Sequence, residues 1–249
     1  MKKIIAIMQP TYMPWLGYFS MIDQVDEFVF LDNVQIEKRS WQVRNKIKYN
    51  DAEKILTIPI KKENSHENRH IFSTSYSGDD WKKSHIDSIR QAYSKAKYFD
   101  TVIPFLENIY RQKYTSIGEF TETIIMEICK KIGITTPFYL ATKMNALGHK
   151  DQLLVNICNI RNADAYLSPQ GSATYIEAIN PAGEFGINNV DLFYLNYEHP
   201  QYTQLGKNFM AYIGVYDLLF NEGFESALAI IRSGARNNYT SEEFRRLNL

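Results

Sequence analysis

Long apolar runs are missing from the 249-residue sequence, and this absence limits the class of protein. The first apolar run, at residues 3–8, is shorter than the core of a secretory signal peptide, and no small-residue cleavage site follows it. No later run approaches the roughly 18 residues of a transmembrane helix. The sequence therefore predicts a cytoplasmic protein without membrane insertion.

An excess of charge of either sign is also missing, because 28 basic residues balance 28 acidic ones. The chain lacks the basic footprint of nucleic-acid-binding proteins and of polybasic membrane anchors, so we expect neither as a mode of binding. Cysteine is scarce. Cys129 and Cys158 lie in amphipathic helical patterns without a paired motif, which predicts buried free thiols.

Short motifs with well-known catalytic chemistry are absent as well. The chain has no Gly-x-Gly-x-x-Gly, no phosphate-binding Gly-Lys-Ser/Thr loop, no nucleophile-elbow serine and no zinc-type spacing of histidine and cysteine. We therefore predict no metal site. Aromatic residues, by contrast, make up 14% of the chain and include 17 tyrosines. This content suits a polar-lined groove for sugars or nucleotides as well as a core.

Strand-like apolar runs alternate with helical patterns along the chain, which predicts an α/β fold with an open, mostly parallel sheet flanked by helices. No linker or internal repeat divides the sequence, so we expect one domain over residues 1–249 with a helical insertion at about residues 79–132. The expected strands are residues 3–8, 27–31, 54–60, 137–141, 165–168 and 190–195, and the helices outside the insertion are 15–24, 149–162, 208–222 and 225–233.

The segment after the first expected strand, residues 9–19 (QPTYMPWLGYF), is the most informative in the chain. Its prolines delay the start of a helix, and ligands in open parallel sheets bind beyond the carboxyl ends of the strands. We expect a substrate-binding loop, against the alternative of a packed strand-to-helix corner. Its candidate binding residues are Gln9, Tyr12, Trp15 and Gly17, the last through backbone amides that suit an anion.

Two further loops are expected at the same edge of the sheet. Asp32 and Asn33 follow the second strand, where a carboxylate suits an amine or a hydroxyl, and a turn aspartate bonded to its own backbone is the alternative. The loop after residues 165–168 has amides and hydroxyls that suit a phosphate, or it forms an ordinary helix cap. The candidate binding residues in that loop are Ser168, Gln170, Gly171 and Ser172.

A basic segment at residues 38–48 (KRSWQVRNKIK) surrounds one tryptophan in an otherwise neutral protein. Arginine can fork onto a phosphate while tryptophan stacks on a ring, so we expect an anion site here rather than a solvated loop. Its candidate residues are Lys38, Trp41, Arg44 and Asn45.

Two histidines are the better candidates for proton transfer, because imidazole titrates near neutrality. His85 lies near the start of the helical insertion and is a candidate general base, and His199 precedes a proline and is a candidate in the binding site. A surface histidine or one held by ordinary hydrogen bonds is the alternative for each.

Five ordered segments resemble the WbqC-like protein family over essentially the whole chain. They are residues 9–19, FLDNVQ at 30–35, WQVRN at 41–45, YLSP at 166–169 and DLLFN at 217–221. That family resembles genes of bacterial O-antigen and other surface-polysaccharide clusters, and the resemblance implies transfer of a glycyl or other aminoacyl unit to an amino sugar. Relatives carry histidine before Gln-Pro, where this chain has Met8, so the resemblance implies no imidazole there.

A second resemblance concerns the fold alone. The strand, the loop of prolines and aromatics and the helix opening at residues 16–18 are similar to the start of nucleotidylyltransferase and class I synthetase-like folds. In those folds a His-x-Gly-His signature meets nucleotide phosphates. This chain keeps the glycine and replaces both histidines.

Together these features predict a transferase that acylates the amine of a nucleotide-linked amino-dideoxy sugar in the synthesis of lipopolysaccharide O-antigen or another surface polysaccharide. Asp32 or His85 would be the general base, and the donor would be an aminoacyl adenylate made with ATP or a thioester on an acyl carrier protein. One alternative is a non-catalytic module that binds a sugar nucleotide or a carrier protein. Another is a nucleotidylyltransferase, for which ATP should raise the melting temperature.

Overall fold

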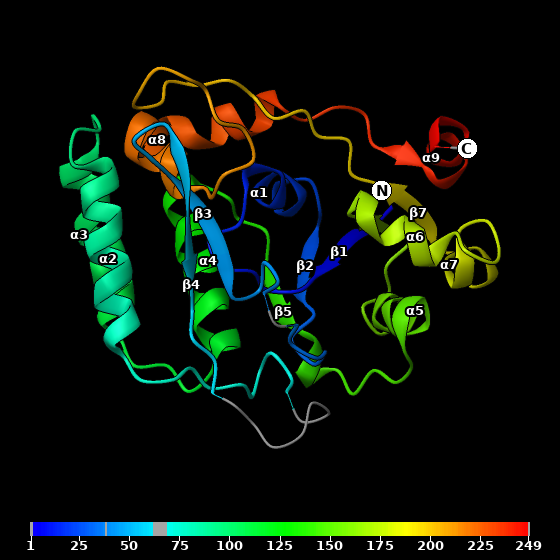
Figure 1. Cartoon of the computed structure of the whole chain (residues 1–249). Helices are drawn as coiled ribbons and strands as arrows, with labels where there is room; N and C mark the ends of the chain where they lie inside the picture. The colour runs from blue at the N-terminus through cyan, green and yellow to red at the C-terminus, as the bar shows by residue number, and fades with distance from the viewer. Residues whose placement is uncertain (1, 38, 62–68, 249) are drawn as a thin grey trace.

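The computed structural model describes residues 2–37, 39–61 and 69–248, and its centre is a six-stranded sheet in the order β5-β2-β1-β6-β7-β8 (Figure 1). The first five strands of this order are parallel, and β8 pairs antiparallel with β7. The sequence-based expectation of an open, mostly parallel α/β sheet is confirmed. The strands are β1 Ile4–Met8, β2 Glu27–Phe30, β5 Phe138–Leu140, β6 Ala165–Ser168, β7 Asp191–Tyr194 and β8 Tyr239–Thr240.

The strand order reverses between β1 and β6. From β1 the chain builds β2 and β5 on one side of the sheet, and it then crosses to build β6 and β7 on the other side. Ligands of open α/β sheets bind outside the carboxyl ends of the strands at such a switch point. The loop after β1 therefore starts at the position most favourable for binding.

Helices cover both faces of the sheet, which explains why β1 and β6 are almost continuously apolar. Ala6 packs into one core cluster, while its neighbours Ile5 and Ile7 pack into another, because successive side chains of a strand point to opposite faces. The first cluster contains residues of α1 Leu16–Asp23, α2 Asp80–Tyr93, α3 Phe99–Arg111, α4 Ile117–Ile132 and α8 Tyr216–Ser233. The second contains residues of α5 Lys150–Ile160, α6 Ala173–Ile176 and α7 Gly183–Ile187, with α9 Ser241–Asn248 packed against it.

A separate hairpin, β3 Arg44–Tyr49 and β4 Ala52–Thr57, lies outside the main sheet. The expected strand at residues 54–60 therefore belongs to the hairpin, and the basic segment supplies its partner strand. Asn50 and Asp51 make the tight turn possible, because both adopt a positive φ (49° and 58°) that asparagine and aspartate tolerate.

The predicted helix over residues 208–222 is wrong in its first half. Residues 195–215, which we call the strap, cross the molecule without helical structure, and α8 begins only at Tyr216 (Figure 1). The strap passes so close to the loop after β1 that a Cβ on Gly214 would lie 2.9 Å from the carbonyl oxygen of Met13. In the described part of the chain, no helix is long and apolar enough to cross a membrane.

Candidate functional site

A cavity of about 290 Å³ opens beside the carboxyl end of β1. Its walls come from the loop after β1, the first turn of α1, the start of the hairpin and the strap. We call it the aromatic pocket, because four of its nine lining residues are tryptophan or tyrosine. The lining residues are Met8, Thr11, Pro14, Trp15, Tyr18, Trp41, Asn45, Lys46 and Tyr212.

Large aromatic rings at the pocket are open to solvent. The exposed fractions of Trp41 and Tyr212 are 53% and 55%, which is unusual for side chains of this size. The Trp15 ring packs against two tyrosines, with its centroid 5.5 Å from that of Tyr197 and 5.6 Å from that of Tyr212. Open ring faces of this kind stack on sugar rings and nucleobases.

Gly17 provides the space for the Trp15 ring. A Cβ on Gly17 would lie 2.1 Å from the tip of the indole, so only glycine allows the ring to lie against the helix backbone. Trp15 is the N-cap residue of α1, and its side chain makes no capping hydrogen bond. Trp15 and Tyr18 bring the start of α1 to the pocket, and a helix start favours an anionic acceptor.

Asn45 fixes the loop after β1 onto the hairpin. Its side-chain amide donates to the carbonyl oxygens of Tyr12 and Met13 at 3.0 and 2.6 Å. The backbone amide of Tyr12 donates to the carbonyl oxygen of Trp41 at 2.9 Å. Asn45 thus lines the pocket and also joins the loop after β1 to the segment that carries Trp41.

Gln9 lies behind the wall of the pocket, whereas Lys46 lines it. The side-chain oxygen of Gln9 accepts a hydrogen bond from Gln42 at 2.7 Å, and its carbonyl oxygen accepts one from the Tyr18 hydroxyl at 3.0 Å. Gln9 therefore supports the wall rather than lining it. Lys46 brings an ammonium group to the pocket and forms an ion pair with Glu53 at 2.5 Å.

Asp32, a predicted general base, is buried and fully engaged in hydrogen bonds. Its two carboxylate oxygens accept from the backbone amide and the hydroxyl of Thr142, at 2.9 and 2.6 Å. These bonds connect the end of β2 to the short helix that follows β5. Asp32 does not line the aromatic pocket, and its contacts are those of a structural residue.

The Asp32→Ala variant is expected to lose about 2–4 kcal/mol of unfolding free energy, because two hydrogen bonds to a charged group disappear and Thr142 loses its acceptor. Thr142→Val, which removes only the hydroxyl, should cost about 1 kcal/mol. Urea unfolding of both variants checks this. An Asp32→Ala protein as stable as the wild type would contradict the structural role.

His85, the second predicted base, lies in the interior on α2. Its Nδ1 atom is 2.8 Å from the hydroxyl of Tyr12, which also shares a short hydrogen bond with the hydroxyl of Tyr110. Trp81 packs edge-on against the imidazole at 5.1 Å. Burial lowers the pKa of His85 to about 4, so the ring is neutral near pH 7. Tyr12 is likewise an interior residue, although the sequence predicts it in the binding loop.

His85 is expected to make stability depend on pH. Its pKa is about 4 when folded and about 6.5 when unfolded, so the unfolded chain binds the extra proton in this window. The contribution, up to about 3 kcal/mol, is complete above pH 6.5 and is lost as the pH falls towards 4. Glu122, whose pKa burial raises to about 7, has the opposite slope.

The comparison of wild type with His85→Gln isolates this effect, because Glu122 is present in both proteins. The stability advantage of the wild type should shrink as the pH falls from 7 to 4 in chemical denaturation series. Parallel pH profiles of the two proteins would show that His85 does not titrate in this way.

The loop after β6 closes on itself and on the strap. Ser168 is buried and its hydroxyl donates to the Pro169 carbonyl at 3.2 Å, while Gln170 donates to the Leu195 carbonyl at 2.8 Å. The amide of Ser172 donates to Pro169 at 3.1 Å, and Gly171 is exposed. None of these predicted phosphate-binding residues lines the aromatic pocket.

The remaining predicted residues that the structure describes do not line the aromatic pocket. His199 packs edge-on against Tyr212, with ring centroids 5.0 Å apart, and therefore lies behind the pocket wall. Burial lowers its pKa. Arg44 begins β3, and its Nε is buried without a hydrogen-bond partner among the described residues. Asn33 lines a different cavity, of about 580 Å³, near the ends of β2 and β5. Lys38 lies outside the described residues.

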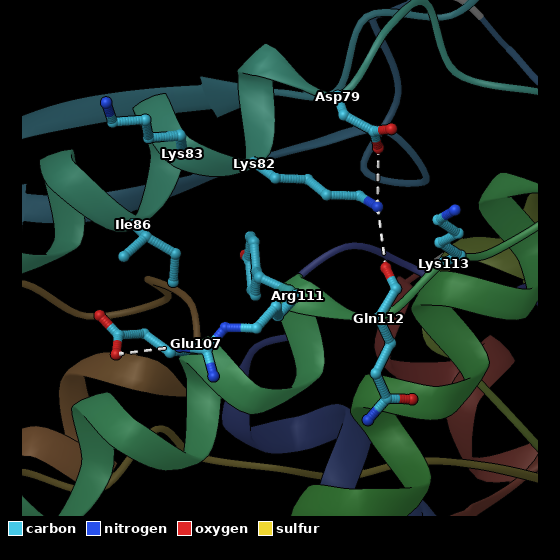
Figure 2. A pocket seen from close by; sticks show the side chains of 9 residues that line it. Asp79, Lys82, Lys83, Ile86, Glu107, Arg111, Gln112 and Lys113 are labelled. Atoms are coloured by element: carbon cyan, nitrogen blue, oxygen red, sulfur yellow. Dashed lines mark hydrogen bonds and ion pairs between the residues drawn. The ribbon is translucent and has the colours of Figure 1, made fainter.

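A cavity of about 420 Å³ with charged lining residues lies between the first half of α2 and the end of α3 (Figure 2). Its most buried cation, Lys82, donates to the carboxylate of Asp79 at 2.8 Å, to the Gln112 carbonyl at 3.0 Å and to the Tyr76 hydroxyl at 3.1 Å. Three acceptors occupy the three hydrogens of this ammonium group. Lys82 therefore has no N–H group left to donate to a substrate in this cavity.

Sequence reasoning missed three residues of the aromatic pocket in particular. Tyr18 and Lys46 lie inside the two segments singled out, but no residue type or spacing distinguished them from their neighbours. Tyr212 had no local signal, because the strap places it at the pocket only through tertiary contacts. Among the residues that the structure describes, no group of three or more His, Cys, Asp or Glu side chains is arranged to hold a metal ion.

Comparison with known proteins shows what the chain is similar to. The model of the WbqC-like protein family matches residues 9–228, which include every residue of the aromatic pocket except Met8. A Mycobacterium tuberculosis protein named "Uncharacterized protein Rv1507c" is 30% identical over 228 residues, which cover 91% of this chain and 96% of that protein. No solved structure matches the chain. The chain is therefore a member of the WbqC-like protein family.

Proposed function

We propose that the protein binds a nucleotide-linked amino sugar in the aromatic pocket and transfers a small acyl unit, glycyl or another aminoacyl group, to the sugar amine. The observation that supports the binding step is the pair of half-exposed rings, Trp41 and Tyr212, over a cavity at the carboxyl end of β1. Open parallel sheets bind nucleotides at this edge. The transfer step rests on the family resemblance, which also implies a role in the synthesis of O-antigen or another surface polysaccharide.

The two halves of such a ligand match different parts of the pocket. A sugar or base ring would stack on Trp41 or Trp15, and phosphate groups would lie at the uncapped start of α1 near Lys46. Ligand sites usually have volumes of about 300–1,000 Å³, so the pocket of about 290 Å³ suits one ring. The rest of the nucleotide sugar would extend over the exposed rings.

The proposed reaction needs a neutral amine. The amine nitrogen forms a bond to the acyl carbon, the bond from that carbon to the carrier sulfur or adenylate oxygen breaks, and the amine proton leaves with the departing group. Among the residues that the structure describes, no carboxylate or imidazole group lines the pocket. The ammonium group of Lys46 disfavours a second cation nearby and so lowers the pKa of a bound amine, which helps the amine to react without an adjacent base.

A non-catalytic module that binds a sugar nucleotide or a carrier protein is the second candidate. One observation favours it: Asp32 and His85, the predicted bases, are buried and engaged in hydrogen bonds away from the pocket. Such a module keeps the ring-binding surface and needs no group for proton transfer.

Mass spectrometry distinguishes the two candidates. The protein is incubated with nucleotide-linked amino sugars and either glycine with ATP or a glycyl-carrier thioester. A mass gain of one glycyl group that Trp41→Ala reduces supports the transferase. Saturable sugar-nucleotide binding without a mass gain from any donor supports the module. Absence of binding overturns both.

A further inference from the structure

A cavity of about 410 Å³ lies at the turn end of the β3–β4 hairpin and shares no lining residue with the aromatic pocket. The hairpin turn, the C-terminal end of α2, the strap and the first turn of α8 enclose it. We call it the Asp217 cavity. Its lining residues include Lys48, Asp51, Tyr93, Lys95, Gly206 and Asp217.

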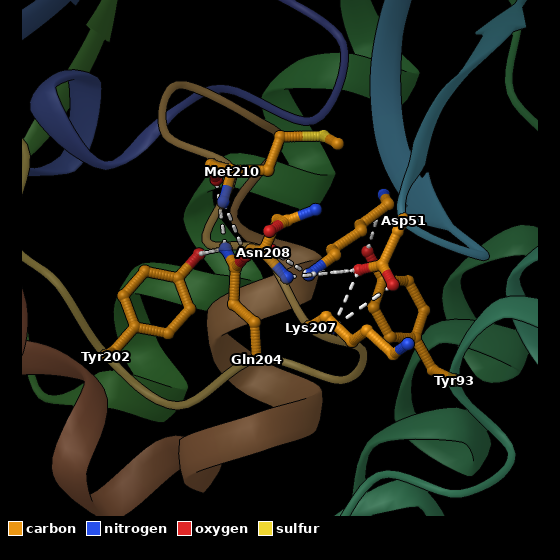
Figure 3. Close-up of polar contacts among 8 residues, drawn as sticks. Asp51, Tyr93, Tyr202, Gln204, Lys207, Asn208 and Met210 are labelled. Atoms are coloured by element: carbon orange, nitrogen blue, oxygen red, sulfur yellow. Dashed lines mark hydrogen bonds and ion pairs between the residues drawn. The ribbon is translucent and has the colours of Figure 1, made fainter.

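On one wall of this cavity, the charged groups of Asp51 and Lys48 bind each other and the backbone of the strap (Figure 3). Asp51 accepts hydrogen bonds from the backbone amide of Lys207 at 2.9 Å and of Asn208 at 3.4 Å. The buried ammonium group of Lys48 lies 3.2 Å from Asp51 and also donates to the Asn208 carbonyl. These contacts join the hairpin turn to the strap, so hydrogen bonds and an ion pair hold this wall in place.

Asp217, on the α8 side, differs from this wall. It is completely buried and lines the cavity, yet neither carboxylate oxygen has a hydrogen bond of ordinary geometry within the described chain. The hydroxyls of Tyr93 and Tyr202, the Gln204 amide and the Lys48 ammonium face it and favour its charged form. Burial outweighs them and raises the pKa of Asp217 to about 6.

A buried carboxylate whose neighbouring donors lie outside ordinary hydrogen-bond geometry is unfavourable, so one that lines an open cavity indicates a ligand that supplies a better-placed donor. The volume exceeds by far the roughly 30 Å³ of a water molecule. A positively charged N–H donor gives the strongest hydrogen bond to a carboxylate. Asp51, the other acid of the cavity, is already satisfied by the strap and Lys48.

We infer that the Asp217 cavity binds a small organic ammonium ligand whose N–H groups donate to the Asp217 carboxylate. Because the two cavities share no lining residue, this site does not depend on the function proposed for the aromatic pocket. Binding requires the ionised carboxylate, so the affinity should rise as the pH passes upwards through about 6.

The test uses methylammonium as the probe and nuclear magnetic resonance of the full-length protein as the readout. We expect saturable shifts of the Asp217 carboxyl carbon at pH 7.5 and an affinity about tenfold lower at pH 5, where most of the carboxyl is protonated. Tetramethylammonium has the same charge but no N–H donor, so it should bind at least about tenfold more weakly than methylammonium.

Asp217→Asn keeps the shape of the side chain and should abolish methylammonium binding. Asp87→Asn, at an exposed carboxylate of α2 that does not line the cavity, should leave the binding unchanged. The inference is overturned if methylammonium fails to saturate the site, if Asp217→Asn binds it as well as the wild type, or if tetramethylammonium binds equally. Should Asp217→Asn not fold, the wild-type carboxyl is titrated with and without methylammonium. Bound ligand must lower the pKa of Asp217, and an unchanged pKa overturns the inference.

Discussion

Replacing Gly17 with alanine is expected to lower the free energy of unfolding by about 1–3 kcal/mol and to weaken sugar-nucleotide binding at least about tenfold. The new Cβ would lie 2.1 Å from the Trp15 indole, so the ring must leave its place in the pocket wall. Alanine is the better helix former by about 1 kcal/mol, so the loss should appear despite a gain in helix propensity.

Gly171→Ala is the matched control for this prediction. Gly171 is also a glycine of a predicted binding loop, but apart from its chain neighbours no described residue has an atom within 4 Å of the position that its Cβ would take. Its replacement should change stability by less than about 0.5 kcal/mol and leave the affinity unchanged. Urea unfolding and calorimetric titration of the two variants provide the comparison. Equal behaviour of the two variants would show that Gly17 does not hold Trp15 in place.

Trp41→Ala is expected to lower the affinity for a nucleotide-linked sugar by about tenfold to a hundredfold, because an aromatic stacking contact contributes about 1–3 kcal/mol. Its side chain is 53% exposed, so the fold should be little affected. Titration calorimetry measures the change. Phe72→Ala, at a ring 47% exposed and outside the pocket, should keep the wild-type affinity. If Trp41→Ala binds the sugar nucleotide as tightly as the wild type does, the ligand does not stack on Trp41.

The strands and the position of the loop after β1 could be predicted because their signals are local. A strand that is covered by helices on both faces is almost continuously apolar, so a few residues are enough to recognise it. Pro10 and Pro14 mark the loop after β1 directly in the sequence. The exposed Trp41 also followed from its setting, since a tryptophan among cations has few reasons to be buried.

The roles of polar residues depended on partners that are remote in the sequence. Asp32 reads as a catalytic candidate at a strand end, but its carboxylate is bound by Thr142, 110 residues away. His85 and Tyr12 are 73 residues apart and meet only in the core. Tyr212 reaches the pocket because the strap crosses the molecule, where the sequence predicted a helix.

The three tryptophans of the chain provide the most direct test of the central claim, that the aromatic pocket binds a nucleotide-linked amino sugar. Each indole N–H gives its own signal in a nitrogen–proton correlation spectrum. Titration should shift the signals of Trp15 and Trp41 in a saturable way and leave that of Trp81, which is only 6% exposed and lies in the core, in place. Saturable binding that leaves the Trp15 and Trp41 signals unmoved would contradict the account.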